Sequence, residues 1–317
     1  MGWCISLVMD KLEPLITILL GAFNGEKFLA DQLDSIQAQS HKNWRVLISD
    51  DGSTDNTKQI ILHYQKIWGK EKLQLRQGPQ MGFAQNFLSM ACNTGITSDY
   101  YAFCDQDDVW LPDKLKIALH HLGNKSSEIP SVYCGRTVYT NENLVPKGFS
   151  SLFLLPKTFR NALVQSIAGA NTMVFNNAMK KLLEKIGLVP AVSHDWWMYQ
   201  LVTGVGGYIH YDETPLVLYR QHHGAIMGSN TSVFDVFKRF GLLFSGRYKT
   251  WNDQNIRCLK IAKFHLLETS VELIEEFESL KNNKLNLRLN LFKKTKLYRQ
   301  KFSETMFLKL AVILNKI

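Results

Sequence analysis

The stretch that decides the fold is Tyr100-Tyr101-Ala102-Phe103-Cys104-Asp105-Gln106-Asp107-Asp108-Val109-Trp110, an apolar run followed at once by three carboxylates in four positions. The apolar run predicts a buried strand, which places the carboxylates at the carboxyl edge of a sheet, where open α/β folds bind ligands. Like charges this close repel unless a cation lies among them, and a divalent metal with oxygen ligands is the usual solution. For this cluster taken alone, the alternative is a solvated acidic turn that caps a helix expected from about Pro112.

A second acidic cluster favours the interpretation as a binding site. Asp50-Asp51-Gly52-Ser53-Thr54-Asp55 also follows directly on an apolar run, Val46-Leu47-Ile48. Because parallel strands end at the same edge of a sheet, we expect the two clusters to lie close together. Asp50 and Asp51 would then accept hydrogen bonds from a ligand, with helix capping as the alternative. Asp55 is explained by the preference of a helix N-terminus for acidic side chains.

The segments around both clusters alternate between strand-like and helix-like periods. The expected strands are at 16–20, 45–49, 73–75 and 100–104, and helical periodicity separates and follows them. This order predicts an α/β fold with a mostly parallel central sheet and helices on both faces. Beyond Pro130 the pattern loosens, and we expect strands at 132–139, 172–175 and 215–219 and helices at 177–186 and 195–202.

The chain is expected to have three parts. Residues 1–13 are interpreted as an irregular leader, residues 14–228 as the α/β domain, and residues 229–317 as a helical, basic extension. The division follows from the loss of strand signals after about Ser229.

Composition limits the class of protein. With 317 residues, 45% of them hydrophobic, the chain can bury a full core. Five scattered cysteines without a CxxC spacing indicate a reducing compartment and argue against a disulfide framework or a zinc site. The first residues lack the features of a signal peptide, and no apolar run has the length of a membrane span. We therefore expect a cytoplasmic protein.

Five segments together resemble the family 2 glycosyltransferases, which have the GT-A fold. Three of them follow expected strands, and two lie downstream: Gly21-Ala22-Phe23-Asn24-Gly25, Asp50–Asp55, Asp105–Asp108, His194-Asp195-Trp196-Trp197 and Tyr219-Arg220-Gln221-His222. The last two are similar to the bacterial rhamnosyltransferase branch. The resemblance covers roughly Pro14 to Ala225.

The resemblance implies an inverting, metal-dependent transfer of a sugar to a hydroxyl of a growing, lipid-linked bacterial surface glycan. The branch suggests L-rhamnose from dTDP-L-rhamnose, and a UDP-hexose is the alternative donor. A sugar nucleotidyltransferase is a weaker alternative, because such enzymes usually carry Arg and Lys in the glycine-rich loop after the first strand. The segment Gly21–Gly25 has neither.

The resemblance also implies roles for single residues. A divalent metal, Mg²⁺ or Mn²⁺, is expected at Asp105, Asp107 and His222. Residues on the donor side are Ala22, Phe23, Asn24, Asp50, Asp51, Gly82, Asn86, Asp105 and Arg220.

Asp195 is the candidate general base. An inverting transfer needs a carboxylate beside the acceptor hydroxyl, and an Asp next to two tryptophans suits a partly desolvated site with a raised pKa. The alternative is a helix N-cap with the tryptophans in the core. Gly169, Trp196 and Trp197 are expected on the acceptor side, one tryptophan packing inside and the other facing a sugar.

The formal net charge of +9 arises largely in the tail. Eight basic residues and no acidic one lie between Lys281 and Lys301. The charge alone allows a nucleic-acid partner. The aromatic residues Phe292, Tyr298 and Phe302 favour instead an amphipathic helix at an anionic membrane, at its inner face, with a solvated helical face as the alternative. We expect no nucleic-acid partner.

Overall fold

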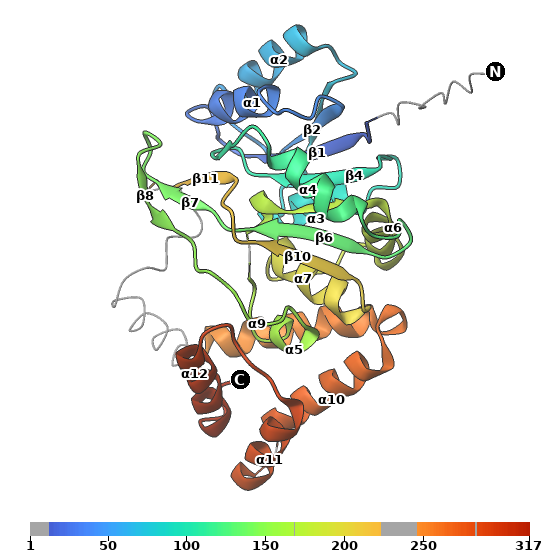
Figure 1. The fold of residues 1–317 in the computed structure, drawn as a ribbon, viewed down its shortest axis with the longest axis vertical. Helices are drawn as coiled ribbons and strands as arrows, with labels where there is room; N and C mark the ends of the chain where they lie inside the picture. The colour runs from blue at the N-terminus through green and yellow to red at the C-terminus, as the bar shows by residue number, and fades with distance from the viewer. Residues whose placement is uncertain (1–12, 168, 223–245, 283) are drawn as a thin grey trace, which may run out of the picture.

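The computed structural model describes residues 13–167, 169–222, 246–282 and 284–317. Figure 1 shows a central sheet with helices on both sides and a group of helices at the C-terminal end. The predicted leader, except Glu13, and the predicted domain boundary at residue 228 lie outside the described residues. The α/β fold class is confirmed.

The main sheet has seven strands in the order β10-β6-β9-β4-β1-β2-β3. All neighbours run parallel except β9, which is antiparallel to both β4 and β6. The strands are β1 (Ile16–Ala22), β2 (Trp44–Asp50), β3 (Leu73–Gln77), β4 (Tyr100–Cys104), β6 (Ser131–Gly135), β9 (Val174–Asn176) and β10 (Tyr208–Asp212).

Alternation of side chains along the central strands divides the core into two layers. In β1, Ile16, Ile18 and Leu20 belong to one apolar cluster, whereas Leu19 belongs to the other. Because a parallel sheet is covered on both faces, both sets are fully buried, which explains the continuous apolar runs in the sequence.

The helices of the α/β part cover opposite faces of this sheet. One cluster takes apolar side chains from α1 (Leu29–Gln37), α2 (Thr57–Trp68) and α4 (Lys114–Gly123). The other takes them from α3 (Phe83–Ala91), α5 (Phe159–Ala162), α6 (Asn177–Ile186) and α7 (His194–Gly204). The helix α7 is buried along nearly all of its length.

A second, four-stranded sheet lies beside the carboxyl edge of the first, with the order β5-β11-β7-β8 (Figure 1). Its strands are β5 (Val109–Trp110), β7 (Val138–Thr140), β8 (Pro146–Phe149) and β11 (Val217–Arg220). The single strand predicted at 132–139 was therefore wrong, since β6 and β7 belong to different sheets. The chain leaves the first sheet at Arg136, whose backbone N–H donates to the carbonyl of Asp212.

The C-terminal helices pack on the α/β part through one continuous core. The helices are α9 (Arg247–Ile261), α10 (Glu268–Asn282), α11 (Leu285–Thr295) and α12 (Phe302–Ile313). The short 3₁₀ turn η2 (Lys263–His265) lies between α9 and α10, and another, η1 (Ala170–Thr172), precedes β9. Leu259, Phe277 and Val312 share a cluster with Trp197 of α7. No helix within the described ranges is both long and apolar enough to cross a membrane.

Candidate active site

The carboxyl ends of β1, β2 and β4 bring the two acidic clusters together. Ala22 is paired with Asp50, and Leu20 with Cys104, so the segments that follow these strands lie side by side. This arrangement agrees with the expectation that the clusters share one edge of the sheet.

The loops after β1 and β2 are joined by hydrogen bonds. The backbone N–H of Asn24 donates to Ser53 Oγ at 2.9 Å, and Asn24 Oδ1 accepts from the N–H of Thr54 at 2.9 Å. Asn24 has a φ of 48°, a left-handed conformation that Asn tolerates better than most residues. The predicted donor-side residues of the first loop therefore hold a defined shape against the second.

Asp50 and Asp51 of the second cluster also stabilise the loops around them. Asp50 is buried, and its Oδ1 accepts hydrogen bonds from the backbone N–H and the hydroxyl of Ser53. Lys58 Nζ lies 3.4 Å from Asp50 Oδ2. Asp51 Oδ1 accepts from the N–H of Gln80 at 2.6 Å, which ties the loop after β3 to the site.

Gly82 and Asn86 shape the start of α3. Gly82 precedes this helix with a φ of 86°, a conformation that a side chain would strain. Asn86 Nδ2 donates to the carbonyl of Ser49 at 2.9 Å, while its buried Oδ1 has no hydrogen-bond partner in the described part of the chain.

Gln106 is a site residue that the sequence analysis missed. Its Oε1 accepts from the N–H of Phe23 at 2.9 Å, and its Nε2 donates to the Phe23 carbonyl at 2.8 Å. Gly25 leaves the room for this contact, since a Cβ there would lie 2.2 Å from Gln106 Oε1. Its position inside the acidic motif was the only signal in the sequence.

The acidic turn after β4 places Asp105 and Asp107 in unlike surroundings. Asp107 Oδ2 lies 2.9 Å from Nε2 of His222, two residues beyond the end of β11. Burial raises the pKa of Asp105 to about 8, and the negative charges of Asp107 and Asp195 act in the same direction. The carboxylates of Asp105, Asp107 and Asp195 thus gather at this edge of the sheet.

The donor set fits a divalent cation. Two of the three predicted metal ligands, Asp107 and His222, are in contact, and Asp105 is a half-buried carboxyl crowded by like charges that a cation would neutralise. Oxygen ligands with an imidazole are compatible with Mn²⁺, and carboxylates suit Mg²⁺. Among the described residues, the three side chains whose ligand atoms all lie within 4.8 Å of one another are others: His121, His210 and Asp212.

Asp108 has a structural role. Its side chain is fully buried and accepts hydrogen bonds from Asn171 Nδ2 and from the backbone N–H of Arg220. Burial raises its pKa well above the ordinary value, as do the charges of Asp107 and Asp105. The N-cap of α4 is Asp113, so Asp108 does not cap that helix.

Arg220 stabilises the acidic turn that contains Asp107. Its guanidinium donates to the carbonyls of Asp107 at 3.0 Å and Glu142 at 2.7 Å, and to Asp31 Oδ2 at 2.7 Å. The side chain is buried above the ring of Phe28. These contacts engage all three nitrogens, so the structure shows Arg220 supporting Asp107, and the donor contact expected from the sequence stays a prediction.

Asp195 lies in the first turn of α7, where Ser193 is the N-cap. Its Oδ1 accepts from the backbone N–H of Trp196 at 2.8 Å. Burial raises its pKa, against the lowering effect of hydrogen bonds from Ser193 and the backbone. The ring of His194, the residue before Asp195, stacks on Phe87 of α3 with ring centres 4.2 Å apart. This contact fixes the start of α7 over the sheet.

Both tryptophans after Asp195 pack inside the protein. Trp196 is 6% exposed and donates from Nε1 to the carbonyl of Ala162, and Trp197 is 1% exposed. The expectation that one of them faces a sugar was therefore wrong. The physical reason is that α7 is enclosed by the sheet on one side and by α5 and α9 on the other.

Gly169 leaves space for the side chain of Asn171. A Cβ at this position would lie 2.7 Å from Asn171 Oδ1, so a side chain there would displace the amide that donates to Asp108. Its predicted place on the acceptor side stays a prediction.

The chain belongs to Glycosyl transferase family 2, whose sequence profile matches residues 17–187. The protein is thus a glycosyltransferase, which excludes the alternative of a sugar nucleotidyltransferase. It is similar to the dTDP-rhamnosyl transferase RfbG of Shigella flexneri, with 29% identity over 244 residues that cover 73% of this chain and 81% of the relative.

Two solved structures share the GT-A fold. TarS of S. aureus, residues 1–349 in complex with UDP-GlcNAc, has a TM-score of 0.51 at 15% identity and covers 95% of this chain and 89% of its own. The mannosyltransferase PcManGT of Pyrobaculum calidifontis, in complex with GDP-Man and Mn²⁺, has a TM-score of 0.50 at 14% identity, with 96% and 86% covered. At this level of identity the likeness shows the fold alone.

Proposed function

We propose that this glycosyltransferase is inverting and metal-dependent, and that it transfers L-rhamnose from dTDP-L-rhamnose to a hydroxyl of a growing, lipid-linked bacterial surface glycan. The observation that carries the proposal is the gathering of Asp105, Asp107 and Asp195 at the carboxyl edge of the sheet. The rhamnose donor is supported by the similarity to RfbG. A UDP-hexose donor is the alternative.

In this proposal Asp195 is the base that activates the acceptor. The acceptor oxygen forms a bond to C1 of the sugar while the bond from C1 to the phosphate oxygen breaks, and the hydroxyl proton passes to the Asp195 carboxylate. The raised pKa of Asp195 favours this step, because a less acidic carboxylic acid retains the proton better. The nucleoside diphosphate leaves from the opposite side of the sugar.

Asp105, Asp107 and His222 would hold Mg²⁺ or Mn²⁺ in this mechanism. The metal would supply positive charge to the two phosphates of the donor. Arg220 keeps Asp107 in place through its backbone carbonyl, and Gln106 keeps the Phe23 loop in place. Asp50 and Asp51 would accept hydrogen bonds from the base or ribose.

Donor turnover tests the proposal. The full chain is incubated with dTDP-rhamnose, UDP-glucose, UDP-galactose or UDP-N-acetylglucosamine, with Mg²⁺, Mn²⁺ or EDTA, and release of nucleoside diphosphate is measured. Release from dTDP-rhamnose that EDTA abolishes supports the proposal, whereas release from a UDP-hexose alone refutes the rhamnose donor. Nucleotide binding is measured in the same samples, and absence of both binding and release refutes the site.

The variant Asp195→Asn tests the role of the general base separately from the binding of the donor. The variant should lose transfer, by a factor of about 10² to 10⁴, and retain nucleotide binding. Asp113→Asn, which removes an exposed carboxylate at the start of α4, is the matched control and should keep full activity. Transfer by Asp195→Asn at the rate of the control would exclude Asp195 as the base.

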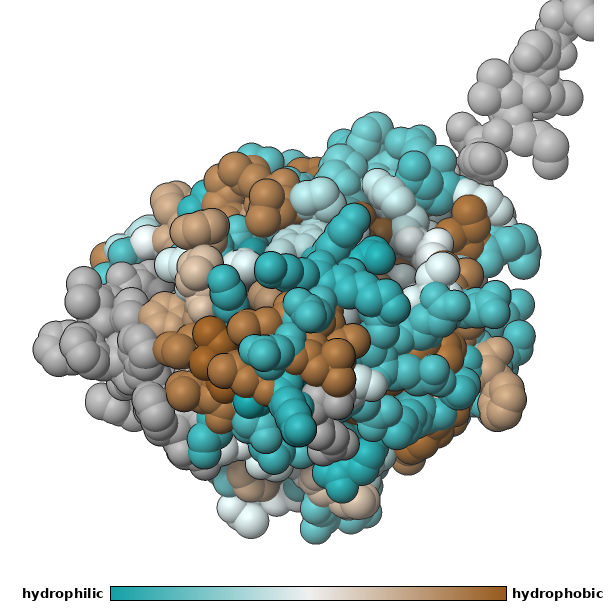
Figure 2. Space-filling view, turned by 90° about the horizontal axis from the view of Figure 1, so that it is seen from below, coloured by the Kyte–Doolittle hydropathy of each residue, from teal (hydrophilic) through white to brown (hydrophobic). Residues whose placement is uncertain are grey.

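We further propose that α12 rests on an anionic membrane surface when the enzyme meets a lipid-linked acceptor. Phe302, 81% exposed, and Met306, 44% exposed, lie one helical turn apart, and the exposed Lys301 precedes them. Figure 2, which views the molecule from the end that carries the C-terminal helices, shows an apolar area bordered by hydrophilic residues. Apolar side chains beside basic ones suit such a surface.

Vesicle sedimentation tests this contact. Binding to vesicles with an anionic lipid should exceed binding to neutral vesicles and should weaken in Phe302→Glu. Leu62→Glu, which changes an exposed leucine of α2 at the opposite end of the molecule, is the control (Figure 1). Equal binding by both variants, or no preference for anionic vesicles, would refute the contact.

A further inference from the structure

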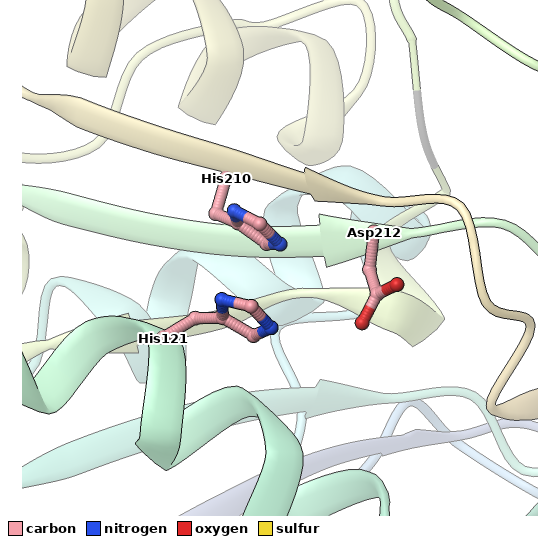
Figure 3. Close-up of side chains that lie close together, drawn as sticks. All are labelled: His121, His210 and Asp212. Carbon is pink, nitrogen blue, oxygen red and sulfur yellow. The ribbon is translucent and has the colours of Figure 1, made fainter.

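Two histidines and an aspartate converge away from the candidate active site. His121 lies in the last turn of α4, and His210 and Asp212 lie on β10, the edge strand of the main sheet (Figure 3). Residues two apart on a strand face the same side, so His210 and Asp212 point together toward α4. One ligand atom from each of the three side chains lies within 4.8 Å of the others.

The carboxylate of Asp212 is held in place by two hydrogen bonds. Tyr133 Oη of the neighbouring strand β6 donates to Asp212 Oδ2 at 2.8 Å, and the backbone N–H of Thr214 donates to Oδ1 at 2.8 Å. Each carboxylate oxygen has a further lone pair for another partner. Outer hydrogen bonds of this kind orient the ligands of metal sites.

The two imidazoles are stacked, with ring centres 3.7 Å apart and planes inclined by 15°. Figure 3 shows that each ring presents a nitrogen toward the Asp212 side. An imidazole nitrogen that carries no proton is the atom that binds a metal.

In two nearly parallel rings the nitrogen lone pairs point in parallel and do not converge on one point. One ring must therefore turn before both can bind the same metal. Rotation of an imidazole about its Cβ–Cγ bond is a soft motion. His121 and His210 are both only half-buried, so each ring is partly bordered by solvent.

We propose that His121, His210 and Asp212 form a second metal site, which takes Zn²⁺ or a similar transition metal with water in the fourth position. Two nitrogens and one carboxylate oxygen match the ligands of open zinc sites, whereas Mg²⁺ and Ca²⁺ prefer oxygen alone. No residue is shared with the site expected at Asp105, Asp107 and His222.

A metal at this site ties α4 to β10. The helix α4 follows the acidic turn of the candidate active site, and β10 leads into β11, which ends at Arg220. The second metal therefore fixes two segments that approach the active site from different parts of the chain. The role that we propose for the metal is to hold these two segments together, and it does not depend on the identity of the donor sugar.

The test measures metal binding in a background without the first site. Untagged full-length Asp107→Asn protein is freed of metal with a chelator and titrated with Zn²⁺ by calorimetry, in excess Mg²⁺. We expect one equivalent to bind. His210→Ala in the same background should bind at least about 10-fold more weakly, whereas His63→Ala, which removes an exposed histidine of α2, should bind as before.

Asp212→Asn is a second variant that keeps the test valid if His210→Ala fails to fold, because it preserves the volume of the side chain. It too should weaken binding at least about 10-fold, and Co²⁺ added to the parent should give a tetrahedral visible spectrum that both variants lose. Zn²⁺ should raise the Tm of the parent and of His63→Ala only. Absence of one-to-one binding, or equal binding in all variants, would overturn the proposal.

Discussion

Exchanging Lys114 for methionine should change how the stability of the protein depends on pH. Lys114 is 1% exposed, and its Nζ lies 3.7 Å from the centre of the Trp110 ring. Among the described residues this Nζ has no hydrogen-bond partner. Burial lowers the pKa of Lys114 from 10.5 to about 7, although Cys104 and Asp108 act in the opposite direction. A methionine has a similar length and no charge.

The magnitude follows from the difference between the two pKa values. The unfolded chain keeps the lysine proton up to about pH 10.5, and the folded protein releases it near pH 7, so the unfolded state binds more protons between these values. Raising the pH therefore stabilises the folded protein by up to about 1.4 kcal/mol per pH unit. From pH 7.5 to 9.5 the gain of the wild type over Lys114→Met is about 2.5 kcal/mol.

Urea denaturation at several pH values measures this gain. The free energy of unfolding is determined from pH 7.5 to 9.5 for the wild type, for Lys114→Met and for Lys116→Met, an exposed lysine of the same helix. Taking the difference between two proteins cancels the other groups that titrate in this range. The curve of Lys116→Met should run parallel to the wild type, and a parallel curve for Lys114→Met would refute the buried, neutral lysine.

Three more predictions concern residues that support the site. Asn171→Ala removes a donor from the buried Asp108 carboxyl and should lower the free energy of unfolding by about 1–3 kcal/mol in urea denaturation; an unchanged value would mean that water replaces the amide. Gly25→Ala should displace Gln106 from Phe23 and raise the KM for the donor, and unchanged kinetics would show that the loop tolerates the shift. Trp196→Phe loses the bond to the Ala162 carbonyl and should cost about 1 kcal/mol of stability without altering the KM for the acceptor, whereas a raised acceptor KM at equal stability would restore the stacking role expected from the sequence.

The central part of the fold could be predicted because its strands are buried on both faces. The apolar runs that form β1, β2 and β4 are continuous for this reason, and each ends at a glycine-containing or acidic segment that marks the edge of the sheet. Helix α6 was predicted at 177–186 and lies at Asn177–Ile186. These features depend on residues near one another in the sequence.

The strand β10 was missed because its side chains are half-buried at the edge of the sheet. Tyr208, Ile209 and His210 alternate weakly in polarity, and their pairing partner β6 lies more than seventy residues earlier. The split of the predicted strand at 132–139 has a similar cause, since the bend at Arg136 is set by a contact with Asp212.

The sequence by itself determined the family, the order of the central strands and helices, and the acidic segments that follow β2 and β4, because periodicity and local motifs express them. Only the tertiary structure decided which side chains meet. It buried both tryptophans of α7, used the guanidinium of Arg220 to hold the turn, and brought His121 beside His210 across 89 positions of sequence. The physical reason is that burial and long-range contacts depend on how whole layers pack, which no local pattern of residues records.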